Sequence, residues 1–124
     1  MGAQGFRDVK PDTKLYGCEA ENITALTVSS TAGRTVEVEL HPLSIGGIGL
    51  PFVMPEIWDL VKRLHNGSLL AGIRESCDSI KLMTERCNII AEGASAVPLA
   101  IALSGKAGSG KIACVVSGGN IGLE

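Results

Sequence analysis

The stretch Ser117-Gly118-Gly119-Asn120 combines residue types that bind ligands, and it directly follows an apolar run at 112–116. Such a run is typical of a buried strand, and ligands of open α/β sheets bind beyond the carboxyl ends of the strands. Paired glycines let a backbone approach a flat ligand closely, and the serine adds a hydroxyl donor. An ordinary strand-ending turn uses the same residues. The pattern alone leaves both interpretations open.

A second glycine-rich stretch, 105–111, matches the GxxxxGK spacing of a P-loop. A P-loop follows a strand, opens a helix and places Ser or Thr directly after its lysine. Here a helix is expected before the stretch and a strand after it, and Ile112 occupies the hydroxyl position. These departures favour a helix-to-strand connection over an ATP site.

Composition and charge exclude several classes of protein. The net charge is −2 and aromatic residues make up only 3%, so the chain has neither the basic surface nor the stacking groups of a nucleic-acid-binding protein. No apolar run reaches membrane-spanning length, and no signal peptide is recognisable at the start of the sequence. The four cysteines form no CxxC pair, which favours reduced thiols over zinc ligands or disulfides. We therefore expect a cytoplasmic protein.

The elements that would position these residues alternate between strand-like and helix-like patterns. The predicted strands are at 15–19, 34–40, 68–74 and 111–116. The predicted helices run from 21 or 22 to 31, from Pro55 to the residue just before Gly67, from Ser76 to 88, and from about 93 to 103. The buried stripe predicted for the third helix is Cys77, Ile80, Met83 (or Leu82) and Cys87. Mixed strands and helices in this order indicate an α/β fold.

Three stretches, in order along the chain, resemble the fold-type-II pyridoxal-phosphate (PLP) enzymes, the family of threonine/serine dehydratases and serine racemases. The sequence LYGCEAEN at 15–22 is similar to the family's YGVEPEN junction, residues 67–96 to its run from a DGSxV strand to an AEGA helix, and VVSGGN at 115–120 to its last strand. The resemblance implies part of that family's core, a partial three-layer sheet-and-helix sandwich. It divides the chain into an N-terminal tail, 1–9, and a partial PLP-enzyme-like α/β domain, 10–124.

The resemblance also assigns roles around the cofactor. The serine that matches Ser117 hydrogen-bonds the pyridine nitrogen of PLP in the family, and its neutral hydroxyl leaves that nitrogen unprotonated. Gly118, Gly119 and Asn120 continue the same motif, and the glutamate that matches Glu92 lies near the cofactor ring. These five residues are the cofactor-binding residues that the resemblance implies.

A metal site is implied more weakly. The glutamate that matches Glu19 binds a divalent cation in some members, together with a backbone carbonyl, here that of Ile23, and an acidic residue two positions later. That last position is Ala25 in this chain. Hard cations require several oxygen ligands. The loss of one carboxylate therefore favours a surface or helix-capping role for Glu19.

The groups that start PLP chemistry have no counterpart here. The family's Schiff-base lysine lies in an S-x-K-x-R-G segment, which this sequence does not contain, and no lysine matches it. Where the family has a GGGG phosphate cup, before the region matching 6–14, the chain has Met1-Gly2-Ala3-Gln4-Gly5. Each hydrogen bond of such a cup contributes about 1.5–3 kcal/mol. We therefore predict no catalytic residue, and no tight retention of PLP by this chain alone.

Three functions are compatible with this combination. The chain is a non-catalytic fragment of a PLP-dependent ammonia-lyase, or one half of a split PLP enzyme completed by another chain, or a module that binds a small ligand or a protein. Half of a family core exposes strand edges, and exposed edges invite pairing. We therefore expect a homo-oligomer formed through sheet edges, or a complementing PLP-enzyme chain as partner.

Overall fold

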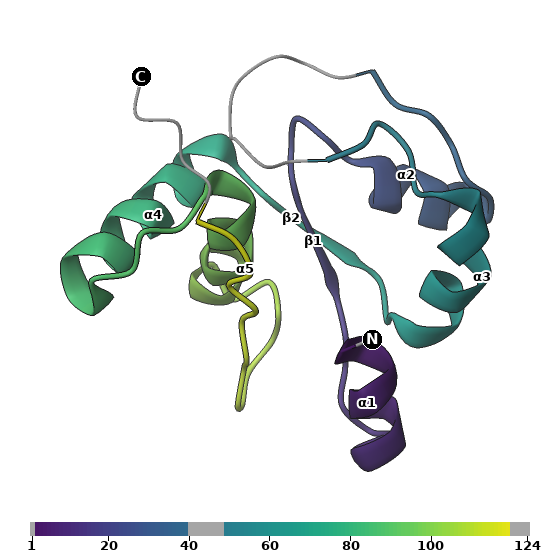
Figure 1. The fold of residues 1–124 in the computed structure, drawn as a ribbon, viewed down its shortest axis with the longest axis horizontal. Helices are drawn as coiled ribbons and strands as arrows, with labels where there is room; N and C mark the ends of the chain where they lie inside the picture. Colours follow the sequence, from purple (N-terminus) through teal and green to yellow (C-terminus); the bar gives the residue numbers. More distant parts are fainter. Residues whose placement is uncertain (1, 40–48, 120–124) are drawn as a thin grey trace.

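The computed structural model describes residues 2–39 and 49–119, and its centre is a short parallel sheet. Strands β1 (Gly17–Ala20) and β2 (Ser68–Ala71) pair in register from Gly17 opposite Ser68 to Ala20 opposite Ala71. The helices are α1 (Gly2–Val9), α2 (Ala25–Ala32), α3 (Pro55–Leu64), α4 (Ile73–Cys87) and α5 (Gly93–Leu103). Figure 1 shows α4 and α5 on one side of the sheet and α2 and α3 on the other. This arrangement confirms the α/β class and the partial three-layer sandwich.

Helix α5 packs directly on the sheet because the residues between them are small. Ala20 and Ala71, partners in the register, are both fully buried and pack in one cluster with Val97, Ala100 and Ile101 of α5. Alanine side chains let the helix backbone approach the strands closely, so an aliphatic core fills the space without aromatic rings. None of the described helices has the length and apolar character needed to span a bilayer.

Helix α4 begins earlier than predicted, and its buried face is different. It starts at Ile73, so β2 ends at Ala71 and Ser76 lies inside the first turns, where its hydroxyl donates to the Gly72 carbonyl at 3.0 Å. Its buried residues are Ser76, Ser79 and Met83.

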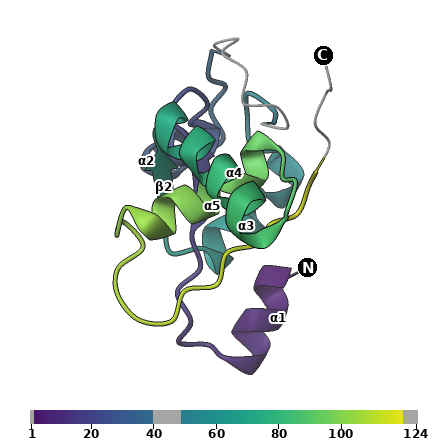
Figure 2. The ribbon, with the colours of Figure 1, turned by 90° about the vertical axis from the view of Figure 1, so that its left-hand side faces the viewer.

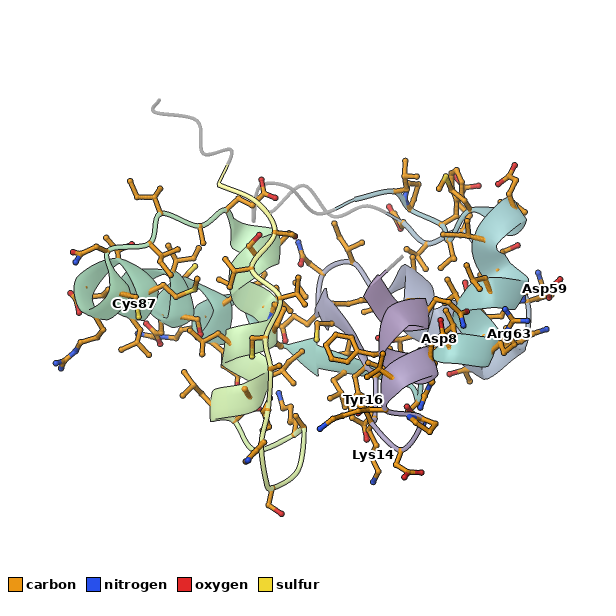
Figure 3. The ribbon with its side chains drawn as sticks, turned by 60° about the horizontal axis from the view of Figure 1, so that its bottom comes forward. Asp8, Lys14, Tyr16, Asp59, Arg63 and Cys87 are labelled. Carbon is orange, nitrogen blue, oxygen red and sulfur yellow. The ribbon has the colours of Figure 1, made fainter. Side chains whose placement is uncertain are left out.

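The predicted stripe of α4 was therefore wrong for two of its members, because Cys77 and Cys87 are exposed. Cys87 lies at the end of α4 that is remote from the sheet (Figure 3). Small serines face α5, where two closely packed helices leave no room for larger side chains.

Two predicted strands are absent from the described residues. Residues 35–39 of the predicted strand 34–40 are in no strand: Val36 N donates to Ser29 Oγ of α2 at 3.0 Å and Val38 N donates to the Pro51 carbonyl, in a loop, at 2.8 Å. Residue 40 lies outside the described range. The predicted buried strand 111–116 forms no ladder, and its Val115 side chain is 71% exposed. Both runs have the alternation or apolar character of strands, but neither lies beside a strand with which it pairs.

The segment predicted as a tail contains helix α1, which Arg7 ties to the last turn of α3. Its guanidinium donates to the Leu64 carbonyl at 2.9 and 3.2 Å and to Asn66 Oδ1 at 2.6 Å. It also donates to the carbonyls of Pro11 and Thr13, at 2.7 and 2.8 Å. A cation is favourable at a helix C-terminus, where carbonyls lack partners within the helix. The boundary at residue 10 stays a prediction.

The N-terminus of α4 is capped by a carboxylate. Glu75 Oε2 accepts from Gly72 N at 2.8 Å and from Lys106 Nζ at 3.3 Å, and Glu21 Oε1 accepts from Ile73 N at 3.2 Å. The Gly72 amide, and after it Lys106, lower the pKa of Glu75 from its ordinary value. Ionised Glu75 therefore stabilises the start of the helix.

This capping predicts a pH-dependent contribution of Glu75 to stability. A carboxyl whose pKa is lower in the folded than in the unfolded protein stabilises fully above its unfolded pKa, about 4.3, and loses this effect as the pH falls towards the folded value. We expect Glu75→Gln to lower the melting temperature at pH 7, and the difference from wild type to shrink below about pH 4. Glu85→Gln, on the exposed face of α4, is the control. A difference that stays constant with pH would contradict the prediction.

Candidate functional site

The segment 112–119 runs back along α5, in the opposite direction to the helix (Figures 1 and 2). Cys114 Sγ donates to the Pro98 carbonyl at 3.4 Å, Gly118 N donates to Ser95 Oγ at 2.8 Å, and Glu92 N donates to the Gly118 carbonyl at 3.1 Å. The backbone of Gly118 is thus held on both sides. These bonds place Ser117 at the N-terminal end of α5.

The two glycines are required by contacts within the chain itself. A Cβ atom at position 118 would overlap the carboxylate of Glu92, and one at position 119 would lie 2.9 Å from the Ile90 carbonyl oxygen. The first obstacle is the end of a flexible side chain and can move, whereas the second is backbone. The close approach predicted for these glycines therefore occurs against α5 and the residues before it.

Ser95 is a site residue that the sequence alone did not indicate. It lies in the first turn of α5, is 2% exposed, and accepts the Gly118 amide. In the sequence it is one small residue among several in AEGASA, so only its hydroxyl distinguishes it. Its role in positioning depends on a partner 23 residues away along the chain.

The structure brings together four of the five predicted cofactor-binding residues, and Asn120 lies outside the described residues. Ser117 is exposed, and within the described part of the chain its hydroxyl forms no hydrogen bond. Glu92 is half-buried beside Gly118, and its carboxylate does not cap α5. A hydroxyl with no hydrogen bond among the described residues is the kind of group that fits the ring nitrogen of PLP. The described residues show no counterpart for the phosphate side.

Glu19 lies in a neighbouring cavity of about 150 Å³ at the C-terminal end of β1, which Ala94 and Val97 of α5 also line. Its carboxylate accepts the Leu26 and Thr27 backbone amides, at 2.6 and 2.9 Å. The helix-capping role favoured for Glu19 is therefore what its hydrogen bonds show. Within residues 2–39 and 49–119, no three His, Cys, Asp or Glu side chains group as a metal site.

The thiols near the site are poor nucleophiles. Burial, and to a smaller degree the charge of Cys114, raises the pKa of Cys18, which also lines the cavity. Burial raises the pKa of Cys114 as well. A thiol with a raised pKa stays protonated at neutral pH, and only the thiolate attacks. Cys18 and Cys114 are therefore not activated as nucleophiles.

The glycine contacts predict unequal costs for two similar substitutions. Gly119→Ala should weaken the docking of segment 112–119 on α5 by about 1–3 kcal/mol, because the Ile90 backbone cannot move away. Gly118→Ala should cost less, because the Glu92 carboxylate can rotate aside. Faster amide exchange at Glu92 and Gly118 is the measurement. Gly5→Ala, where an added Cβ meets nothing within 4 Å, is the matched control. Equal effects at 118 and 119 would refute this explanation.

Comparison with known proteins agrees with this geometry. The curated relatives include the L-threonine ammonia-lyases of Thermotoga maritima, 32% identical over 96% of this chain, and of Geobacter sulfurreducens, 29% identical over 98%. The chain spans less than a third of these relatives, 30% and 31% of their lengths.

Solved structures show the same fold over a larger share of their chains. The threonine deaminase of T.th. matches 98% of this chain with a TM-score of 0.90 and 23% identity, and 44% of its own chain is covered. Maize serine racemase matches 98% with a TM-score of 0.88 and 23% identity, and 40% of it is covered. The sequence profile described as "Pyridoxal-phosphate dependent enzyme" matches residues 2–118. The chain thus belongs to the family of pyridoxal-phosphate-dependent enzymes.

Proposed function

We propose that this chain supplies the ring-nitrogen side of a PLP site of the threonine/serine ammonia-lyase type, and that it is not catalytic on its own. The observation that carries the proposal is a pair of hydrogen bonds to the Gly118 backbone: its amide donates to Ser95 Oγ, and its carbonyl accepts from the Glu92 amide. It fixes the backbone next to Ser117 while the hydroxyl of that serine stays available. Bound PLP would supply an electron-withdrawing ring for chemistry at the substrate amine.

The residues of this chain have separate tasks in that site. Ser117 would hold the ring-nitrogen end of PLP by donating its hydroxyl hydrogen, and a neutral hydroxyl partner would make the ring a milder electron sink than a carboxylic partner would. Glu92 places a carboxylate at the same end of α5, beside the Gly118 backbone. Ser95 touches no cofactor and acts as a positioning residue.

The lysines support the non-catalytic part of the proposal. Lys106 Nζ donates to the Leu70 carbonyl at 3.0 Å and contacts Glu75. Lys62 pairs with Asp59 on α3, and Lys81 lies near Glu85 on α4.

The remaining lysines are at positions 10, 14 and 111, and all three side chains are exposed. Lys14 precedes β1, whereas the cavity that Glu19 lines lies at the C-terminal end of that strand. No lysine of the described residues makes a polar contact with Ser117 or Glu92. A lysine that forms the imine would therefore come from elsewhere.

The second candidate function is one half of a split enzyme, which one observation favours. The segment that carries Ser117 exposes Ile112, Val115 and Val116 to solvent. An unpaired apolar segment fits a complementing chain that brings the lysine and the phosphate cup.

Mixing the chain with PLP tests the proposal directly. We expect no absorbance band of a lysine–PLP adduct, no lysine labelled after borohydride reduction, and no ammonia from threonine or serine. A band that borohydride fixes to one lysine would overturn the non-catalytic interpretation.

Complementation distinguishes the two candidate functions. Deamination that appears only when the N-terminal part of a related ammonia-lyase is added would favour the split enzyme. In that mixture Ser117→Ala should lower activity, whereas Ser109→Ala, in the exposed turn after α5, should not. A defined complex without deamination would favour a binding module.

We further propose that the chain associates with itself through its strand edges. In the described residues each of β1 and β2 pairs along one edge only, and Ile90 and Val115 are 70% and 71% exposed. Unpaired edges and contiguous apolar surface both favour association. We expect light scattering at high micromolar concentration to give a mass of at least twice that of the chain. A strictly monomeric mass would count against self-association.

A further inference from the structure

We propose that Glu19 is the N-terminal cap of helix α2, delivered from strand β1, and that this cap takes the place of a divalent cation at the C-terminal end of the sheet. The inference goes beyond the proposed function, because it concerns cations and folding and does not depend on PLP. Its consequence is that this corner of the fold forms without a metal ion.

The bonds of Glu19 are those of a helix cap. Leu26 and Thr27 are the second and third residues of α2, and their amides donate to Glu19 Oε1 and Oε2. Capping side chains accept from these two positions. The residue that precedes the helix, Thr24, makes no such bond with its own side chain. Glu19, six residues before the helix, therefore satisfies the amides that Thr24 leaves unpaired.

The carboxylate has little capacity left for a cation. Besides the two amides, Oε2 accepts from Thr27 Oγ1 at 2.7 Å and from Ser68 Oγ at 3.1 Å. An ionised carboxylate offers about four lone-pair directions. Three donors already fill Oε2 and the Leu26 amide occupies one direction of Oε1, so a metal ion finds at most one open lone-pair direction on this carboxylate. The positive end of the α2 dipole also opposes a cation at this position.

The surrounding cavity lacks the other ligands that a hard cation needs. Among the described residues that line it, Glu19 is the only carboxylate, and the rest are Cys18, Ile23, Ala25, Gly49, Leu50, Ala94 and Val97. Ala25 is buried, with 5% exposure, and its methyl group offers no oxygen ligand. Calcium takes six to eight oxygen ligands, and magnesium needs a near-octahedral set.

Cation binding to the full chain is the first test. We expect the melting temperature to be the same in EDTA and in millimolar Mg²⁺, Ca²⁺ or Mn²⁺, and the electron paramagnetic resonance signal of Mn²⁺ to show no bound ion. A cation at a hundred times its Kd would raise the melting temperature by several degrees. A saturable rise that Glu19→Gln abolishes would overturn the proposal.

Hydrogen exchange tests the cap itself. Glu19→Gln replaces one acceptor oxygen by a donor, so the Leu26 and Thr27 amides should exchange roughly five- to tenfold faster. Glu37→Gln, at an exposed position outside the described helices, is the matched control. If Glu19→Gln does not fold, Thr27→Val removes only the hydroxyl donor and should give a smaller increase. Unchanged exchange at Leu26 and Thr27 in a folded variant would refute the cap.

Discussion

Because β1 and β2 are parallel, both strands end on the same side of the sheet, and several helices begin there. Helix α2 follows the C-terminal end of β1, and helix α4 follows the C-terminal end of β2. The first turn of α5 lies at the same edge, since Ala94 lines a cavity with Glu19. Every helix N-terminus carries a partial positive charge and unpaired amides. The N-termini of α2, α4 and α5 all lie at the C-terminal ends of the strands, so negatively charged side chains are favourable at this end of the sheet.

Glutamates meet this requirement, but they do not all do so in the same way. Glu19 is hydrogen-bonded to α2, and Glu21 and Glu75 are hydrogen-bonded at the start of α4. Glu92, at the start of α5, makes no cap bond with its side chain, which lies against Gly118 instead. Three carboxylates therefore stabilise helix N-termini, while the carboxylate of Glu92 lies against Gly118 and makes no cap bond.

The sequence predicted features that depend on local patterns and missed those that depend on distant partners. The helix predicted to end at residue 31 is α2, which ends at Ala32 because Gly33 adopts a left-handed conformation. The runs at 34–40 and 111–116 have strand patterns, but a strand also needs a neighbour, and no spacing reveals where Val38 N or Gly118 N will bond. In α4, close packing against α5 selects serines for the buried face, which a search for apolar stripes cannot find. Ser95 was missed because its role depends on Gly118, which lies 23 residues away along the chain.

Ser117 lies on the segment 112–119, so binding of a ring to its hydroxyl would be coupled to binding of a partner to that segment. The segment 112–119 is attached to α5 by three polar contacts and joins no strand ladder in the described residues. A chain that pairs with this segment would add backbone hydrogen bonds and bury Val115, which would hold Ser117 in one position. A ring that bonds Ser117 would order the same segment. Because coupling between two binding events is reciprocal, each would strengthen the other by the same factor. A partner that covers Val115, which is 71% exposed, would therefore strengthen any binding of a ring at Ser117.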